Sequence, residues 1–257
     1  MSASRSQIQE ALLRLDELTR RLRRECPWDR EQDERTIVPH TLEEAYELAD
    51  AAQRRDDAKL LDELGDVLFQ VHFLSLLLEE RGAGDLAAVA EHCRQKLIRR
   101  HPHVFGEAEV EDAAHVLRNW DEIKRAEPGR EEGIFGDVPE NLPALLHARK
   151  VQRRAASTGF DFDGIPYDAV SGELEELEAA GGERDAAFHE VGDVLFAAVN
   201  VARKLHVDPE LALRSASARF RGRVEAAERL AAHGGAAWDE LEPEDKLTYY
   251  AQARLNE

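Results

Sequence analysis

The chain of 257 residues carries 53 acidic and 34 basic side chains, which gives a formal net charge of −19. This charge argues against a nucleic-acid polymer as a partner, because phosphate backbones are bound by basic surfaces. No run of residues reaches the roughly 20 uninterrupted apolar positions of a membrane span, and the N-terminus lacks a secretory apolar core. Cys26 and Cys93 have neither a disulfide framework nor metal-ligand spacing, so a cytoplasmic protein is expected.

The composition predicts an all-α fold. Helix-forming residues dominate, and alternating β-branched runs of convincing length are lacking. Thr41 and Glu44 have the spacing of a capping box, which predicts a helix start at Thr41. In chain order, helices are expected over residues 6–25, 41–54, 58–80, 86–100, 116–125, 142–156, 167–180, 184–205, 209–233 and 243–256.

Helix-breaking glycine and proline residues gather between residues 128 and 143. They predict two helical modules, an N-terminal one over 1–128 and a C-terminal one over 146–257, joined by a linker over 129–145. Modules of this length have the usual size of a domain.

One acidic pattern occurs in both modules. It reads Glu44-x-x-Glu47 followed by Glu63-x-x-Asp66 in the first, and Glu173-x-x-Glu176 followed by Glu190-x-x-Asp193 in the second. Residues i and i+3 lie on one face of a helix, so the two carboxylates of each pair point the same way. The two parts of the pattern recur at offsets of 129 and 127 residues, which indicates an internal repeat.

The repeated acids predict a divalent metal site in each module. Converging carboxylates repel one another and raise their own pKa values unless a cation neutralises them. Oxygen ligands alone favour Mg²⁺, with Mn²⁺ as a possible substitute. The alternative is that the acids form solvated helix faces, but Glu63 and Asp66 border an apolar stripe, where unpaired carboxylates are costly.

Basic and aromatic residues supply candidates for binding a polyphosphate. Lys96 and Arg100 lie one turn apart, and Arg219 and Arg223 repeat that spacing in the second module. The alternative for the first pair is that cations near a helix end complement its dipole. Trp28 is a candidate for stacking on a base, and the alternative is that it anchors a helix start.

Several motifs in a fixed order resemble the MazG family of nucleoside triphosphate pyrophosphohydrolases. They are CPWD (26–29), TLEEAYEL, DELGDVLFQVHF, KLIRRHPHVF, NWDEIKRAE, FGDVPENLPAL and GFDF, and the resemblance covers the chain from about Leu15 to its end. It implies tandem all-α modules and an intertwined homodimer in which helices of two subunits complete each site. It also implies Mg²⁺-dependent hydrolysis of nucleoside triphosphates to monophosphate and pyrophosphate, with broad base tolerance that includes deoxy forms, in a housecleaning role.

The resemblance also assigns roles to particular residues. The metal ligands would be Glu44, Glu47, Glu63, Asp66, Glu173, Glu176, Glu190 and Asp193. Glu43 would be an additional carboxylate directly before the first metal ligand, and it is a candidate to orient or deprotonate water. Asp62 would be its counterpart, directly before Glu63 on the next helix. Lys96, Arg100, Arg219 and Arg223 are taken as catalytic, and Trp28, Lys96, Arg100 and Arg223 as nucleotide-binding.

The second module departs from the family pattern at four positions, which are Gly172, His189, Arg219 and Tyr250. The four core ligands are present in both modules, so the sequence leaves open which module is catalytically active.

Two other classes of protein are considered. A di-iron carboxylate bundle normally has Glu-x-x-His pairs, whereas the i+3 partners here are Glu or Asp. A non-catalytic helical scaffold that uses its carboxylates for dimer structure stays open for at least one module.

Overall fold

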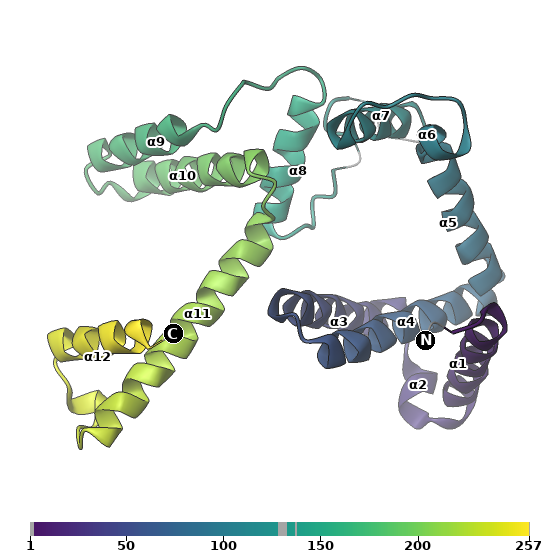
Figure 1. The fold of residues 1–257 in the computed structure, drawn as a ribbon, viewed down its shortest axis with the longest axis horizontal. Helices are drawn as coiled ribbons and strands as arrows, with labels where there is room; N and C mark the ends of the chain where they lie inside the picture. Colours follow the sequence, from purple (N-terminus) through teal and green to yellow (C-terminus); the bar gives the residue numbers. More distant parts are fainter. Residues whose placement is uncertain (1–2, 128–132, 137, 257) are drawn as a thin grey trace. The chain divides into compact units, whose positions relative to one another are not determined.

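The computed structural model describes residues 3–127, 133–136 and 138–256. The first part of the chain forms α1 (Arg5–Glu25), α2 (Pro27–Glu31), α3 (Glu34–Arg54), α4 (Asp57–Glu80), α5 (Leu86–Arg100), α6 (Pro102–Phe105) and α7 (Ala113–Ala126) (Figure 1). The second part forms α8 (Ala144–Ala156), α9 (Tyr167–Ala179), α10 (Arg184–Lys204), α11 (Pro209–His233), the 3-10 helix η1 (Trp238–Glu240) and α12 (Pro243–Leu255).

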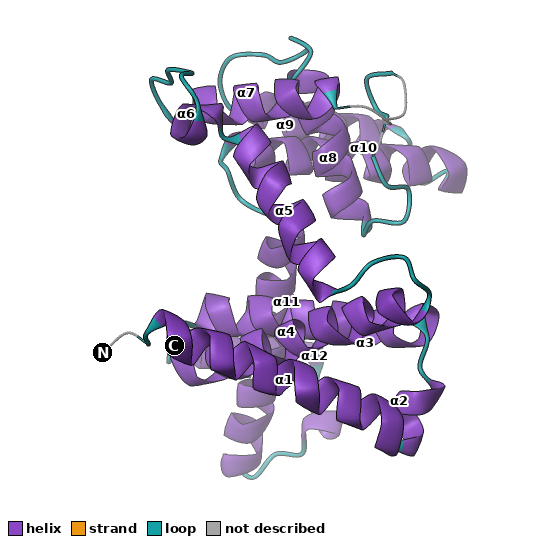
Figure 2. Cartoon of the chain, turned by 90° about the vertical axis from the view of Figure 1, so that its right-hand side faces the viewer, coloured by secondary structure: helices purple, strands orange, loops and turns teal. Residues whose placement is uncertain are grey.

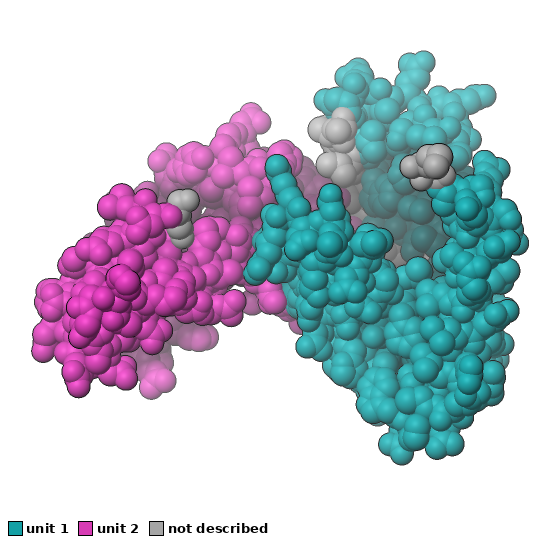
Figure 3. Space-filling view, turned by 60° about the horizontal axis from the view of Figure 1, so that its bottom comes forward, with its two compact units in different colours: residues 1–124 teal, residues 125–257 magenta. Residues whose placement is uncertain are grey.

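The residues that the structure describes contain helices and no strand (Figure 2), which confirms the all-α prediction. The chain divides into two compact units, Met1–Lys124 and Arg125–Glu257 (Figure 3). The predicted linker over 129–145 lies partly outside the described residues, and the predicted module bounds stay a prediction. None of the described helices has the length and apolar character needed to cross a membrane.

The first unit is built on a hairpin of α3 and α4. Arg55 ends α3 in the left-handed conformation with φ of 55°, and Asp56 caps α4 by accepting from a backbone N–H. This tight connection makes the two helices antiparallel neighbours. Their contact forms the core, in which Ile37, Phe73 and Leu77 are buried.

Helix α1 is held against α4 by two bidentate arginine–carboxylate pairs. Arg20 donates to both carboxylate oxygens of Glu79 at 3.0 and 2.6 Å, and Arg23 donates to both oxygens of Glu80 at 2.8 Å. The two-pronged geometry of guanidinium and carboxylate fixes orientation as well as distance. The C-terminal end of α4 is therefore braced by α1.

The predicted helix start at Thr41 is wrong, because α3 already begins at Glu34. Asp33 caps this earlier start, and its carboxylate accepts two backbone N–H bonds at 2.8 and 2.9 Å. Pro39 lies inside the helix, where proline removes one backbone hydrogen bond and normally favours a break. The cap and the burial of Ile37 on the preceding turn keep the helix continuous.

The second unit repeats the hairpin with α9 and α10, which are joined through Gly181 and Gly182, both with positive φ. Helix α8 packs on α10, where the side-chain amide of Gln152 donates to the carbonyl of Phe196 at 2.8 Å. Helices α11 and α12 pack against each other at the end of the chain. Both units therefore present an antiparallel helix pair that carries one copy of the acidic pattern.

Candidate metal centre

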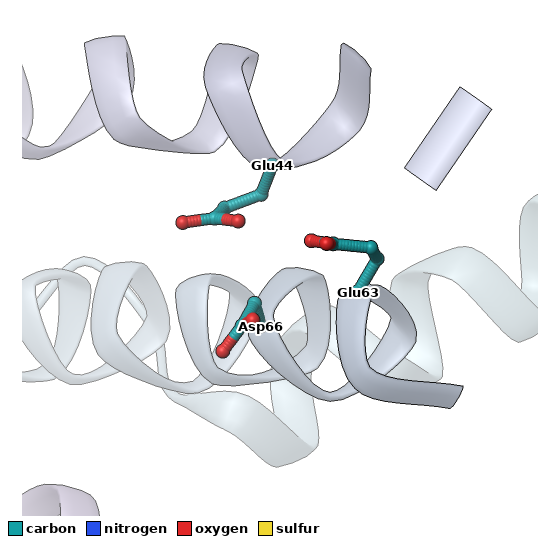
Figure 4. A group of neighbouring side chains, drawn as sticks. All are labelled: Glu44, Glu63 and Asp66. Carbon is teal, nitrogen blue, oxygen red and sulfur yellow. The ribbon is translucent and has the colours of Figure 1, made fainter. Parts of the chain in front are cut away.

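The α3–α4 hairpin brings three predicted metal ligands together. Glu44 on α3 faces Glu63 and Asp66 on α4 (Figure 4), and each of the three offers an oxygen within 4.8 Å of the others. Glu63 is only 1% exposed, whereas Asp66 is exposed to solvent. Hard oxygen donors at this spacing fit Mg²⁺ or Mn²⁺, and the exposed side leaves room for a further ligand.

The α9–α10 hairpin repeats this arrangement in the second unit. Glu173 on α9 and Glu190 and Asp193 on α10 each offer an oxygen within 4.8 Å of the others. Glu190 is only partly buried, in contrast to its counterpart Glu63. The internal repeat seen in the sequence is thus a repeat of side-chain geometry.

In each cluster, burial and the neighbouring carboxylates raise the pKa of one glutamate. Burial raises the pKa of Glu44 above its ordinary value, and the charges of Asp66 and Glu63 raise it further. Burial likewise raises the pKa of Glu173, followed by the charge of Glu176. Carboxylates that are buried near like charges are stabilised by a bound cation, so the donor set fits a metal.

The fourth predicted ligand of each module lies beside the cluster. Glu47 and Glu176 are exposed and fall outside the two groups of three oxygens. Their charges nevertheless contribute to the raised pKa values of Glu44 and Glu173. Both carboxylates are therefore close enough to interact electrostatically with the cluster beside them. Their role as metal ligands stays a prediction.

Lys59 is a residue of the first cluster that the sequence analysis does not single out. Its Nζ forms an ion pair with Oε1 of Glu63 and lies 3.8 Å from Glu47 and 3.6 Å from Asp62. The i, i+4 spacing from Lys59 to Glu63 is the signal that identifies such a pair in a sequence. The equivalent position in the second module is Ala186, so the first cluster alone has a cation at this position.

Replacing Lys59 by methionine is expected to lower the melting temperature of the metal-free protein by about 5 °C, because a buried carboxylate that loses its partner is destabilising. Millimolar Mg²⁺ should restore most of the loss, since the ion then compensates Glu63. The control is Arg21→Met, which breaks an i, i+4 pair with the exposed Glu25 and should have little effect. Equal losses for both variants, in thermal scans with and without Mg²⁺, would contradict this account.

Glu43 and Trp28 share one neighbour in the first unit. Oε2 of Glu43 lies 3.7 Å from Nδ1 of His40, and the Trp28 ring meets the His40 ring edge-on with centroids 5.6 Å apart. Trp28 is 50% exposed, so one part of its ring system is open to solvent. Their roles as catalytic and base-stacking residues stay predictions.

Lys96 and Arg100 lie on α5, which leaves α4 at the end remote from the carboxylates (Figure 1). The distance along α4 from Glu63 to Glu80 is about 25 Å, from the rise of an α-helix. The guanidinium of Arg100 lies 5.5 Å from the centre of the Trp120 ring. Within one chain, the structure does not bring these two cations to the acidic cluster.

Arg219 and Arg223 likewise lie away from the carboxylates of the second cluster. They lie on α11, which follows the end of α10 remote from Glu190. Arg219 donates from Nη1 to the hydroxyl of Ser215 at 2.7 Å. Arg223 lines an open groove of about 460 Å³ between α11 and α12. These arginines are therefore not close to the carboxylates of their own hairpin.

Comparison with known proteins agrees with the motifs. Residues 32–105, which span α3, α4 and α5, match the MazG nucleotide pyrophosphohydrolase domain. The chain is 40% identical over 240 residues to a nucleoside triphosphate pyrophosphohydrolase of Escherichia coli (strain K12), covering 90% of this chain and 91% of that protein. A nucleoside triphosphate pyrophosphohydrolase/pyrophosphatase MazG of Thermotoga maritima is 39% identical over 229 residues, which cover 88% and 87% of the two chains.

A nucleoside triphosphate pyrophosphohydrolase of Mycobacterium tuberculosis is 34% identical over 175 residues, covering 66% of this chain and 53% of that protein. The matched domain contains the whole first cluster, from Glu44 to Asp66. Since the Escherichia coli and Thermotoga maritima relatives match along nearly their whole length, the chain belongs to the MazG nucleotide pyrophosphohydrolase family.

Proposed function

We propose that this chain hydrolyses nucleoside triphosphates to nucleoside monophosphate and pyrophosphate, with Mg²⁺ held at its carboxylate clusters. The observation that carries the proposal is the convergence of Glu44, Glu63 and Asp66 within 4.8 Å on two packed helices. The names of the relatives, which are nucleoside triphosphate pyrophosphohydrolases, support the substrate class and the reaction.

The chemistry follows from the donor set. Mg²⁺ bound there would neutralise charge on the triphosphate and lower the pKa of a bound water. Glu44, Glu63 and Asp66 would hold the ion, and the exposed Glu43 next to Glu44 would accept a proton from the attacking water. The water oxygen bonds to the α-phosphorus, the bond from that phosphorus to the bridging oxygen breaks, and pyrophosphate leaves with the electron pair.

The broad base tolerance in the proposal is supported by Trp28. Its half-exposed ring offers a flat apolar surface, and every nucleobase has a face that stacks on such a ring. Stacking of this kind does not distinguish ribose from deoxyribose. A housecleaning role that removes varied nucleotides, ribo and deoxy, is consistent with a site of low base selectivity.

We propose that the enzyme is a homodimer, because both hairpins leave an apolar stripe uncovered. On α4 the stripe is formed by Leu61, Leu64 and Leu68, which are 75%, 50% and 38% exposed, and on α10 by Phe188, Val191 and Leu195, which are 77%, 45% and 50% exposed. The spacing of i, i+3 and i+7 places each set on one helix face. A contiguous exposed apolar face of this kind is typical of an interface between subunits.

The exposed area supports the same proposal. The chain exposes 18451 Å², whereas two separate compact bodies of half its mass would together expose roughly 14,000 Å². A second copy that covers the stripes would also supply cations that the single chain keeps away from the clusters. In the dimer, Lys96 and Arg100 of one subunit would then contact phosphates held at the carboxylates of the other.

A cytoplasmic location is part of the proposal. Cys26 and Cys93 are both free thiols in the structure, and Cys93 is exposed. Exposed thiols persist in a reducing compartment, where disulfides are rare.

The test is a product analysis with ribo- and deoxynucleoside triphosphates in water enriched in ¹⁸O. We expect equimolar monophosphate and pyrophosphate, with the label in the monophosphate, since the water attacks the α-phosphorus. Chelation with EDTA should stop the reaction and Mg²⁺ or Mn²⁺ should restore it. Release of diphosphate and orthophosphate, or turnover that resists chelation, would overturn the proposal.

A further inference from the structure

Lys59 lies among the carboxylates of the first cluster. Its ammonium forms an ion pair with Glu63 on the same helix and lies 3.8 Å from Glu47 on α3. We propose that Lys59 is an internal counter-ion, which competes with a divalent metal ion for Glu63 and thereby lowers the affinity of this cluster for the ion. The inference rests on the proposed function, because it takes the cluster as a metal site.

The position of Lys59 in α4 is unfavourable for a cation on local grounds. The helix begins at Asp57, so Lys59 lies in its first turn, where the positive end of the helix dipole disfavours positive charge. Helix α10 begins at Arg184 and has Ala186 at the same third position. The surrounding carboxylates, rather than helix formation, therefore account for a lysine at position 59.

The two partners of the ion pair differ in their freedom to move. Glu63 is 1% exposed, whereas the side chain of Lys59 is 48% exposed. Lysine carries its charge on a flexible four-carbon stem, and Glu47 and Asp62 offer other acceptors 3.8 and 3.6 Å from its Nζ. Lys59 can therefore leave Glu63 and remain paired with exposed acids, while Glu63 stays in place.

The carboxylate of Glu63 cannot serve both cations equally well. An Mg²⁺ ion binds its oxygen ligands at about 2.0–2.1 Å, so an ion on Glu63 would share one carboxylate group with the ammonium that already contacts it. Like charges this close repel strongly where burial keeps water away. Metal binding must therefore disrupt the pair between Lys59 and Glu63, and this requirement weakens binding.

The second cluster offers an internal comparison. Ala186 stands four residues before Glu190, where Lys59 stands four residues before Glu63. A metal ion at Glu190 therefore has no lysine at this position to displace. The two clusters share three central acids, so an exchange of this one residue isolates the effect of the counter-ion.

The variant Lys59→Met tests the proposal in the full-length chain. Glu173→Gln and Glu190→Gln are introduced into the parent chain so that the tightest Mn²⁺ site is the first cluster, and Mn²⁺ binding is followed by electron paramagnetic resonance. We expect Lys59→Met to tighten Mn²⁺ binding about tenfold. The control is Arg54→Met, which removes the same charge from an exposed ion pair with Asp50 and should keep the Kd within about twofold.

The reciprocal variant is Ala186→Lys, in a parent chain whose first cluster is disabled by Glu44→Gln and Glu63→Gln. The new lysine lies one turn from Glu190, so Mn²⁺ binding should weaken about tenfold. This variant decides the question alone if Lys59→Met does not fold.

Unchanged or weaker Mn²⁺ binding in Lys59→Met would overturn the inference, because Lys59 would then support Glu63 as a ligand rather than compete for it. Equal tightening in Arg54→Met, or unchanged or tighter binding in Ala186→Lys, would overturn it as well. Absence of Mn²⁺ binding from both parent chains and from the wild type would instead refute the metal site of the proposed function, so the two failures are distinguishable.

Discussion

Replacing Glu44 and Glu173 together by glutamine is expected to lower kcat for pyrophosphate release on the order of a thousandfold, because a catalytic metal contributes several kcal/mol of charge stabilisation. The variant removes the ligand that each cluster takes from the first helix of its hairpin. The expected loss therefore does not depend on which module carries out hydrolysis. Steady-state release of pyrophosphate at saturating nucleotide measures it.

The stability of this double variant separates loss of metal binding from loss of fold. Since the pKa of both glutamates is raised, their charged forms are disfavoured in the folded, metal-free protein. Glutamine removes that repulsion, so the metal-free melting temperature should stay the same or rise while activity falls. The control is Asp50→Asn with Glu178→Gln, which removes two exposed acids from α3 and α9 outside the clusters. A similar loss of activity in the control would point to net charge rather than to ligands.

Replacing Phe73 by alanine is expected to lower the free energy of unfolding of the first unit by about 3–5 kcal/mol. Phe73 is 0% exposed and packs against Ile37, Leu77 and the ring of Phe69, whose centroid is 5.9 Å away. The guanidinium of Arg23 also lies 5.8 Å from the centre of its ring. Removing the ring leaves a cavity at the point where α3 and α4 meet, and urea denaturation measures the loss.

The matched control is Phe105→Ala in the same unit. Phe105 is 62% exposed at the end of α6, so its removal should change the stability by no more than about 0.5 kcal/mol. Because Phe73 lies on the same helix as Glu63 and Asp66, its alanine variant should also weaken Mg²⁺ binding. A full-strength metal site in a destabilised Phe73→Ala protein would show that the hairpin positions the acids without this core.

The helices with unambiguous ends were predictable from the sequence. The predicted ranges for α5 and α11 agree with the structure, and in both cases an aspartate, Asp85 or Asp208, accepts a backbone N–H at the start. Proline at position 102 and glycine at position 234 follow their ends. Helix α3 was harder to predict because Pro39 is a local signal for a break, and the burial that overrides it belongs to tertiary structure.

The candidate site was predictable to the extent that it depends on helix periodicity. The i, i+3 spacing placed Glu63 and Asp66 on one face, and the structure brings both to Glu44. Two features were not accessible in this way. The near-complete burial of Glu63 depends on how α3 lies against α4, and the location of Lys96 depends on the direction in which α5 leaves the hairpin.

The short connection at Arg55 and Asp56 has a consequence for biosynthesis. It makes the first cluster a local structure, complete once the segment from Glu44 to Asp66 has left the ribosome. Contacts of low sequence separation form early in folding, so the nascent hairpin can begin to close before α5 has left the ribosome. Lys59 is translated within the same segment and supplies a cation from the start. Glu63 therefore has a positively charged partner as soon as it is synthesised, before any second subunit is present.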